Sequence, residues 1–106
     1  GTERFHYGVD LAADTGTAIA CFADGTVTAV GESSSYGKYC TVTHANGCTT
    51  LYAHCGRISV SSGAAVKKGE KLGEVGETGM ATGPHLHFEL QKDGVYLNPI
   101  YYVETA

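Results

Sequence analysis

The sequence contains no tryptophan, only two prolines and one methionine, and only seven lysines and arginines among its 106 residues. The shortage of basic residues leaves a formal net charge of −4. Because no basic stripe is available for phosphate contacts, we expect no nucleic-acid partner. No apolar run approaches the roughly 20 residues that span a bilayer, so we expect no transmembrane segment in this chain. The amino terminus also lacks the basic and apolar regions of a signal peptide, and any targeting segment is expected outside the chain.

The composition that is present favours one small β-rich unit. Hydrophobic residues make up 42% of the chain and charged residues 17%, which is typical of a globular protein. The 15 glycines suggest tight turns between short strands, since glycine reaches positive φ without steric cost. No linker or low-complexity tract interrupts the sequence. We therefore expect residues 1–106 to form a single domain that is monomeric when isolated.

Four cysteines, Cys21, Cys40, Cys48 and Cys55, allow three disulfide connectivities in an oxidising compartment. The C-x3-H-x3-C spacing that includes His44 is a weak match to a structural zinc site, because it lacks the usual C-x2-C knuckle. Buried free cysteines that behave as small apolar residues are an equally good interpretation. The sequence leaves the disulfide state open.

Short runs rich in β-branched and apolar residues, each bounded by turn formers, predict strands. They are Thr17–Phe22, Gly25–Val30, Tyr39–His44, Cys48–His54, Arg57–Val60, Lys71–Val75 and His85–Gln91. Asn46-Gly47 predicts a type I′ hairpin turn, and residues 63–70 are not expected to form a helix. The spacing predicts an all-β fold, with an antiparallel β-sandwich or barrel-like core and long loops flanking a groove.

Segment 85–90 (HLHFEL) alternates polar and apolar residues. In a strand, its polar residues His85, His87 and Glu89 share one face, while the apolar residues between them face the core. An isolated H-x-H of this kind is most often a solvated strand face. Its chemical meaning therefore depends on other parts of the chain.

Those other parts are the H-x-x-x-D pair His6 and Asp10, and His54 at the end of the second hairpin strand. A mononuclear hydrolytic zinc needs three nitrogen or oxygen ligands and an open position for water. His6, Asp10 and one histidine of the H-x-H pair supply three ligands. The remaining histidine and His54 can then handle protons, because imidazole titrates near neutral pH.

The motifs HYGVD, NGCTTLYAH and GETGMATGPHLHFEL resemble those of the lysostaphin-type (LytM-like) zinc metallopeptidases, and the likeness extends to Asn98-Pro99. The resemblance implies that His6, Asp10 and His87 bind one zinc ion per chain. It also implies that His54 and His85 stay unligated and act as catalytic residues.

The same resemblance implies a zinc metalloendopeptidase that hydrolyses peptide cross-links or stem peptides of bacterial peptidoglycan, outside the cell or in its envelope. We expect Glu89 to be an ordinary surface carboxylate, although it could instead orient one of the histidines. His44 is expected to be structural. Cys55 departs from the family, which commonly has an apolar residue after Y-A-H.

Two alternatives of other classes remain. The first is an envelope-anchored scaffold or activator domain of the same fold without peptidase activity. The second is a sugar-phosphotransfer domain, which the lack of that family's motifs disfavours. The bond cut is not identified, because glycyl-glycine bridges and D-alanyl-diamino acid cross-links are both substrates in the resembled family. Loops 33–38 and 76–84 are expected to line the groove and to decide between them.

Overall fold

The computed structural model describes residues 8–79, 83–93 and 95–97. Within these residues, nine strands join in one antiparallel sheet, as expected for an all-β chain. They are β1 (Gly8–Ala12), β2 (Ala18–Ala20), β3 (Gly25–Ser33), β4 (Gly37–His44), β5 (Cys48–Ile58), β6 (Ala65–Val66), β7 (Lys71–Val75), β8 (His85–Lys92) and β9 (Val95–Leu97). The part of the chain described here contains no helix long and apolar enough to cross a membrane.

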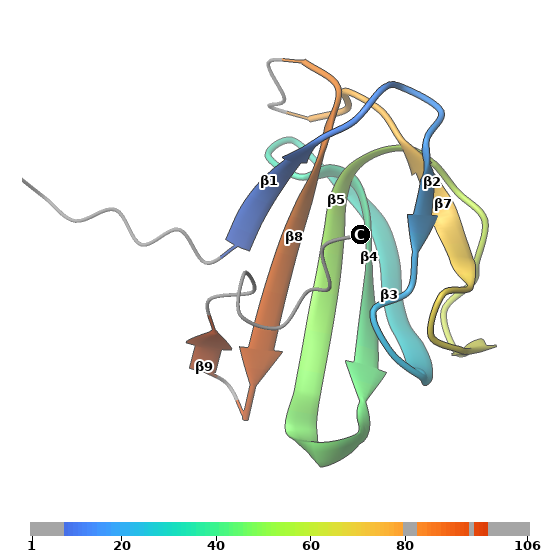
Figure 1. The fold of residues 1–106 in the computed structure, drawn as a ribbon, viewed down its shortest axis with the longest axis vertical. Helices are drawn as coiled ribbons and strands as arrows, with labels where there is room; N and C mark the ends of the chain where they lie inside the picture. Colours follow the sequence, from blue (N-terminus) through green and yellow to red (C-terminus); the bar gives the residue numbers. More distant parts are fainter. Residues whose placement is uncertain (1–7, 80–82, 94, 98–106) are drawn as a thin grey trace, which may run out of the picture.

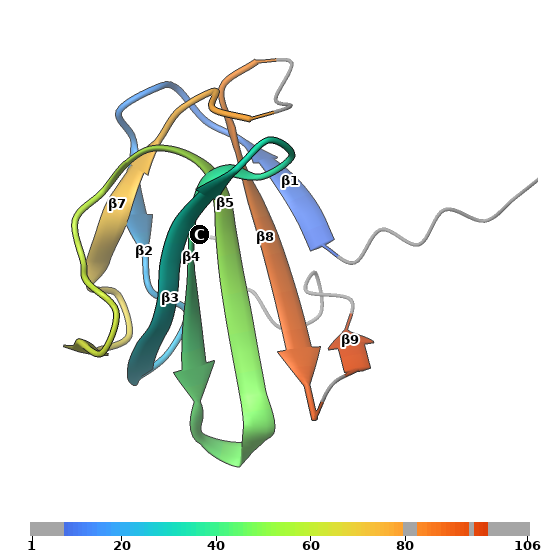
Figure 2. The same cartoon turned by 180° about the vertical axis from the view of Figure 1, so that it is seen from behind.

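The sheet has the strand order β1-β8-β5-β4-β3-β6, and β9 pairs with the C-terminal end of β8. The central strand β5 pairs with β4 and β8, and from Cys55 onward it pairs with β7, with a register shift between Cys55 and Arg57. β2 pairs with β7 and lies with it on the side opposite β1 and β9 (Figure 1). The view from behind shows the same arrangement (Figure 2). The change of partner along β5 therefore connects the central strands to a second, smaller ribbon.

The core lies between the central strands and this ribbon. One cluster of buried apolar side chains connects them, with Val27, Val42, Tyr52, Phe88 and Leu90 from the central strands and Ile19, Leu72 and Val75 from the ribbon. The alternation predicted for segment 85–90 is confirmed in its apolar half: Phe88 and Leu90 are 3% and 2% exposed, and Leu86 packs against the cluster.

His44 belongs to this structural part of the molecule. Its Nδ1 donates to the carbonyl of Asp24 at 2.9 Å, and its Nε2 is hydrogen-bonded to Thr50 Oγ1 at 2.8 Å. Thr50 in turn bonds the hydroxyl of Tyr52. Both ring nitrogens of His44 are thus used inside the fold. This agrees with the structural role expected for His44, and among the described residues Cys40, His44 and Cys48 do not form a metal site.

The predicted hairpin between β4 and β5 is present, but its turn differs from the prediction. A three-residue 3-10 turn, Ala45–Gly47, replaces the two-residue type I′ turn. Gly47 adopts the left-handed conformation, with φ 75°. It also lies against Asp93, whose backbone N–H donates to the Gly47 carbonyl, so a side chain at position 47 would collide with the Asp93 carboxylate. The positive φ predicted at Gly47 is confirmed, whereas the turn is one residue longer than predicted.

All four cysteines are free thiols. Cys21, Cys40 and Cys55 are buried, and Cys48 is partly exposed. Burial raises the pKa of Cys40 to about 12 and that of Cys55 to about 11, and it also raises the pKa of Cys21. The three buried thiols act as small apolar residues of the core.

We expect the native protein to expose one reactive thiol, because the thiolate is the nucleophile and the three core thiols are both shielded and hard to ionise. An aromatic disulfide reagent at pH 8 should modify one cysteine promptly and the other three only in denaturant. Cys48→Ser is the control and should abolish the fast reaction. Two or more fast-reacting thiols in the native protein would contradict this assignment.

Candidate active site

The antiparallel register of β1 and β8 places Asp10 directly opposite His87. His87 Nδ1 lies 2.8 Å from Asp10 Oδ1, and His85 Nε2 lies 3.6 Å from the same oxygen. His87 Nε2 lies 2.9 Å from Glu89 Oε2. The polar half of segment 85–90 therefore projects from one face, as its alternation predicts.

His54 joins this group from β5. The neighbouring residue Ala53 pairs with His87 across β5 and β8. The His54 ring lies 4.8 Å from the His85 ring and 6.1 Å from the His87 ring, measured between centroids. Side chains of β1, β5 and β8 thus bring three imidazoles and two carboxylates together.

The predicted ligand His6 lies outside the described residues. Within the described part of the chain, no three His, Cys, Asp or Glu side chains form a complete metal site. The other two predicted ligands, Asp10 and His87, are in hydrogen-bond contact. The remaining predicted site residues, His54 and His85, lie beside them.

His87 is placed between two carboxylates. Its hydrogen bond to Glu89 raises the pKa of His87; burial opposes this effect, and Asp10 adds to it. Burial tends to raise the pKa of Asp10, but the hydrogen bond and charge of His87 outweigh this, and the pKa is lowered. A neutral imidazole can donate from one nitrogen only. When both carboxyl groups are ionised, facing one with each nitrogen therefore requires a positive charge at His87, carried either by a second proton or by a bound cation.

Glu89 is buried, and the expectation that it would be a surface carboxylate is wrong. Its residue exposure is 6%, and its Oε2 accepts hydrogen bonds from Tyr36 Oη at 2.8 Å and from His87 Nε2. The Tyr36 ring also stacks on the His87 ring, with centroids 6.0 Å apart and planes at 23°. Tyr36 lies in the loop 33–38 that was expected to line a groove, but its contact with Glu89 and His87 was not predicted. The signal that could have found it is a lone aromatic residue within a Ser- and Gly-rich loop.

Two backbone carbonyls of the loop between β7 and β8 are hydrogen-bonded to the other two histidines. His54 Nδ1 lies 2.7 Å from the carbonyl oxygen of Thr78, and His85 Nδ1 lies 2.9 Å from that of Gly83. Since a carbonyl oxygen only accepts, both Nδ1 atoms carry a proton. In the neutral state, Nε2 of each ring is therefore the unprotonated nitrogen.

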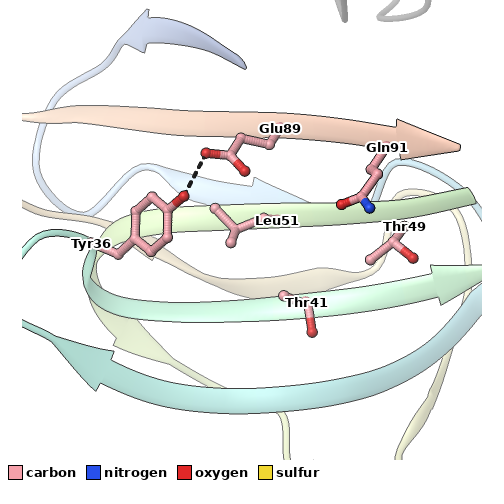
Figure 3. A pocket seen from close by; sticks show the side chains of 6 residues that line it. All are labelled: Tyr36, Thr41, Thr49, Leu51, Glu89 and Gln91. Carbon is pink, nitrogen blue, oxygen red and sulfur yellow. Dashed lines mark hydrogen bonds between the residues drawn. The ribbon is translucent and has the colours of Figure 1, made fainter. Parts of the chain in front are cut away.

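A trough of about 170 Å³ lies on the face of β4, β5 and β8 that also carries Glu89. Figure 3 shows Leu51 between polar side chains, with the Tyr36 phenol bonded to Glu89 at one end. The lining residues are Tyr36, Thr41, Thr49, Leu51, Glu89 and Gln91. Because Glu89 also contacts His87, the trough adjoins the histidine cluster, and Tyr36 of the predicted loop 33–38 forms part of its wall.

Proteins with similar sequences include named cell-wall enzymes. The DD-carboxypeptidase/endopeptidase Mpg of Neisseria meningitidis is 46% identical over 99 residues, covering 93% of this chain and 23% of that protein. The peptidoglycan DD-endopeptidase ShyC of Vibrio cholerae is 41% identical over 103 residues, with the same coverages of 93% and 23%. The chain thus spans about a quarter of the length of these relatives.

Similar solved structures include an M23 protein and a zinc-containing peptidase. The catalytic domain of the M23 protein EnpA from Enterococcus faecalis superposes with a TM-score of 0.86 at 38% identity, covering 95% of this chain and 81% of that one. A zinc-containing peptidase from Vibrio cholerae gives a TM-score of 0.84 at 36% identity, covering 87% and 28%. The family profile described as peptidase family M23 matches residues 4–99. The chain therefore belongs to peptidase family M23.

Proposed function

We propose that this chain is the zinc-dependent catalytic domain of a peptidoglycan endopeptidase. In this proposal Asp10 and His87 are two protein ligands of one zinc ion, and His6 is the third. The observation that carries it is the position of His87 between the Asp10 and Glu89 carboxylates. The names of the relatives and of the zinc-containing structural neighbour support the same conclusion.

The donor chemistry of the described residues fits zinc. Imidazole nitrogen and carboxylate oxygen are both zinc ligand types. If His87 donates from Nε2 to Glu89, its Nδ1 presents a lone pair beside Asp10, and a cation there replaces the second proton that the two carboxylates otherwise require. A carboxylate on the far nitrogen of a metal-bound histidine fixes the ring and its tautomer. When bound, zinc supplies an activated water with a pKa of about 7 and polarises the scissile carbonyl.

We assign His54 and His85 as the catalytic residues that handle protons. Each ring keeps a proton on Nδ1, so Nε2 is the nitrogen that accepts or donates during the reaction. In amide hydrolysis a water oxygen bonds to the carbonyl carbon, the C–N bond breaks, and a proton moves to the leaving amine. Two imidazoles that each carry one proton and one free nitrogen can divide these transfers between them.

The trough supports a peptide as the substrate. Its hydroxyl and amide side chains, from Thr41, Thr49 and Gln91, offer donors and acceptors to an extended peptide backbone. The DD-endopeptidase names of the relatives favour a bond between D-configured residues of a peptidoglycan cross-link. We propose that the chain is one domain of a longer protein that acts outside the cell or in the envelope.

The test combines metal analysis with digestion of cross-linked muropeptide dimers of defined chemistry. We expect about one zinc per chain and cleavage of a dimer into monomers with the gain of one water, read by mass spectrometry. A strong chelator should abolish cleavage, and added zinc should restore it. Zinc binding without cleavage of any dimer would instead favour the scaffold or activator role. Failure to bind zinc would overturn the proposed site.

A further inference from the structure

Thr78 makes three hydrogen bonds near the proposed active site. Its carbonyl oxygen accepts from His54 Nδ1 at 2.7 Å. Its hydroxyl donates to the carbonyl of Cys55 at 2.6 Å and accepts from the backbone N–H of Lys38 at 3.0 Å. Thr78, in the β7–β8 loop, therefore contacts the start of β4 and the second half of β5 and also accepts a hydrogen bond from a histidine ring.

The backbone of His54 is held separately from its ring. His54 has φ 62°, a left-handed conformation that residues other than glycine rarely adopt. Its N–H donates to the Tyr36 carbonyl at 2.7 Å, and its carbonyl accepts from Gly76 N–H at 3.1 Å. These bonds fix where the Cα atom lies but leave the ring free to rotate. The ring packs beside the His85 ring, and the Thr78 carbonyl is the hydrogen-bond acceptor for its Nδ1.

The loop approaches the turn between β3 and β4 very closely. Gly79 has φ 76°, and a Cβ atom there would collide with the backbone nitrogen of Gly37. A Cβ atom on Gly37 would in turn collide with the Thr78 backbone. The backbones of residues 78–79 and of Gly37 are thus in direct contact. Because the hydroxyl and the carbonyl belong to the same residue, a movement of the Thr78 hydroxyl also displaces the Thr78 carbonyl.

We infer that Thr78 is a positioning residue for His54. Its hydroxyl holds the loop on β4 and β5, so that its carbonyl keeps the proton of His54 on Nδ1 and leaves Nε2 as the reactive nitrogen. The catalytic consequence rests on the proposed function, whereas the tautomer itself does not. The inference can therefore fail or hold separately from the peptidase assignment.

The test compares Thr78→Val, which removes the hydroxyl at nearly constant shape, with Thr78→Ser, which keeps it. Ring ¹⁵N chemical shifts of His54, recorded where the ring is neutral, should report the Nδ1–H tautomer in the wild type and in Thr78→Ser. Thr78→Val should give a mixture of tautomers. Its kcat should fall by roughly 10-fold to 100-fold, because a catalytic group displaced by about 1 Å can cost about 10²-fold in rate, with zinc content and KM little changed.

Thr43→Val is the matched control, because Thr43 is exposed and its hydroxyl bonds only Thr28 among the interactions described. It should leave the tautomer and kcat unchanged. Thr78→Ala provides a second hydroxyl-free variant if Thr78→Val does not fold. A pure Nδ1–H signature with wild-type kcat in either folded hydroxyl-free variant would overturn the inference. If no peptidase activity exists, the tautomer measurement alone still decides it.

Discussion

Replacing His87 by alanine is expected to remove zinc and peptidase activity together. His87 is proposed as one of three protein ligands, and two remaining ligands hold the ion poorly against water, so metal affinity should fall by orders of magnitude. The zinc-to-protein ratio after dialysis and the cleavage of muropeptide dimers measure the two effects. The variant should remain folded, because His87 lies on the polar face of β8 and outside the apolar core.

His85→Ala is the matched control on the same strand face. It should keep its zinc, yet its activity should drop by roughly 10²-fold to 10⁴-fold, as for loss of a positioned proton-transfer group. His54→Ala should behave in the same way. A metal-free His85→Ala variant beside a zinc-loaded His87→Ala variant would invert the assignment of the two histidines.

Val27→Asp is expected to unfold the protein. Val27 is 0% exposed in the core cluster, and a carboxyl group there has no partner, so the loss should exceed about 4 kcal/mol. That loss is comparable to the whole stability of a small domain, which is about 5–15 kcal/mol. Circular dichroism and thermal unfolding should report a largely unfolded chain at room temperature.

Val30→Asp tests whether the burial of Val27, and not merely its location in a strand, causes the expected loss of stability. Val30 lies on the same strand, β3, but is 41% exposed. The same substitution there should change stability by about 0.5 kcal/mol or less. Equal destabilisation by the two variants would contradict the described facing of β3.

The sequence predicted two strands almost to the residue and missed others. Lys71–Val75 has the predicted bounds, and β8 extends only one residue beyond its predicted end. β6 and β9, with two and three residues, are too short to show a periodic pattern. β5 is one strand where two were predicted, because the chain passes through Gly56 with a register shift instead of a turn.

For the site, alternation predicted which side chains of β8 share a face, and the family resemblance assigned ligand and catalytic roles that remain proposals. The burial of Glu89 was not predictable from its own strand. Its carboxylate accepts a hydrogen bond from Tyr36, which lies 53 positions away in the sequence. The contacts of Thr78 were equally hidden, because they depend on a close approach of two loop backbones. Local sequence patterns carry no information about such long-range contacts.

The use of main-chain carbonyls by His54 and His85 has a consequence for mutational tolerance. Every residue type carries a carbonyl oxygen, so substitution at position 83 does not by itself delete the acceptor that His85 uses. An alanine scan of the loop would leave both acceptors chemically intact. Insertion or deletion of a single residue, or loss of the left-handed geometry at Gly79, would displace them. Proton placement in these two rings thus depends on the length and shape of the loop and on the Thr78 hydroxyl that holds it.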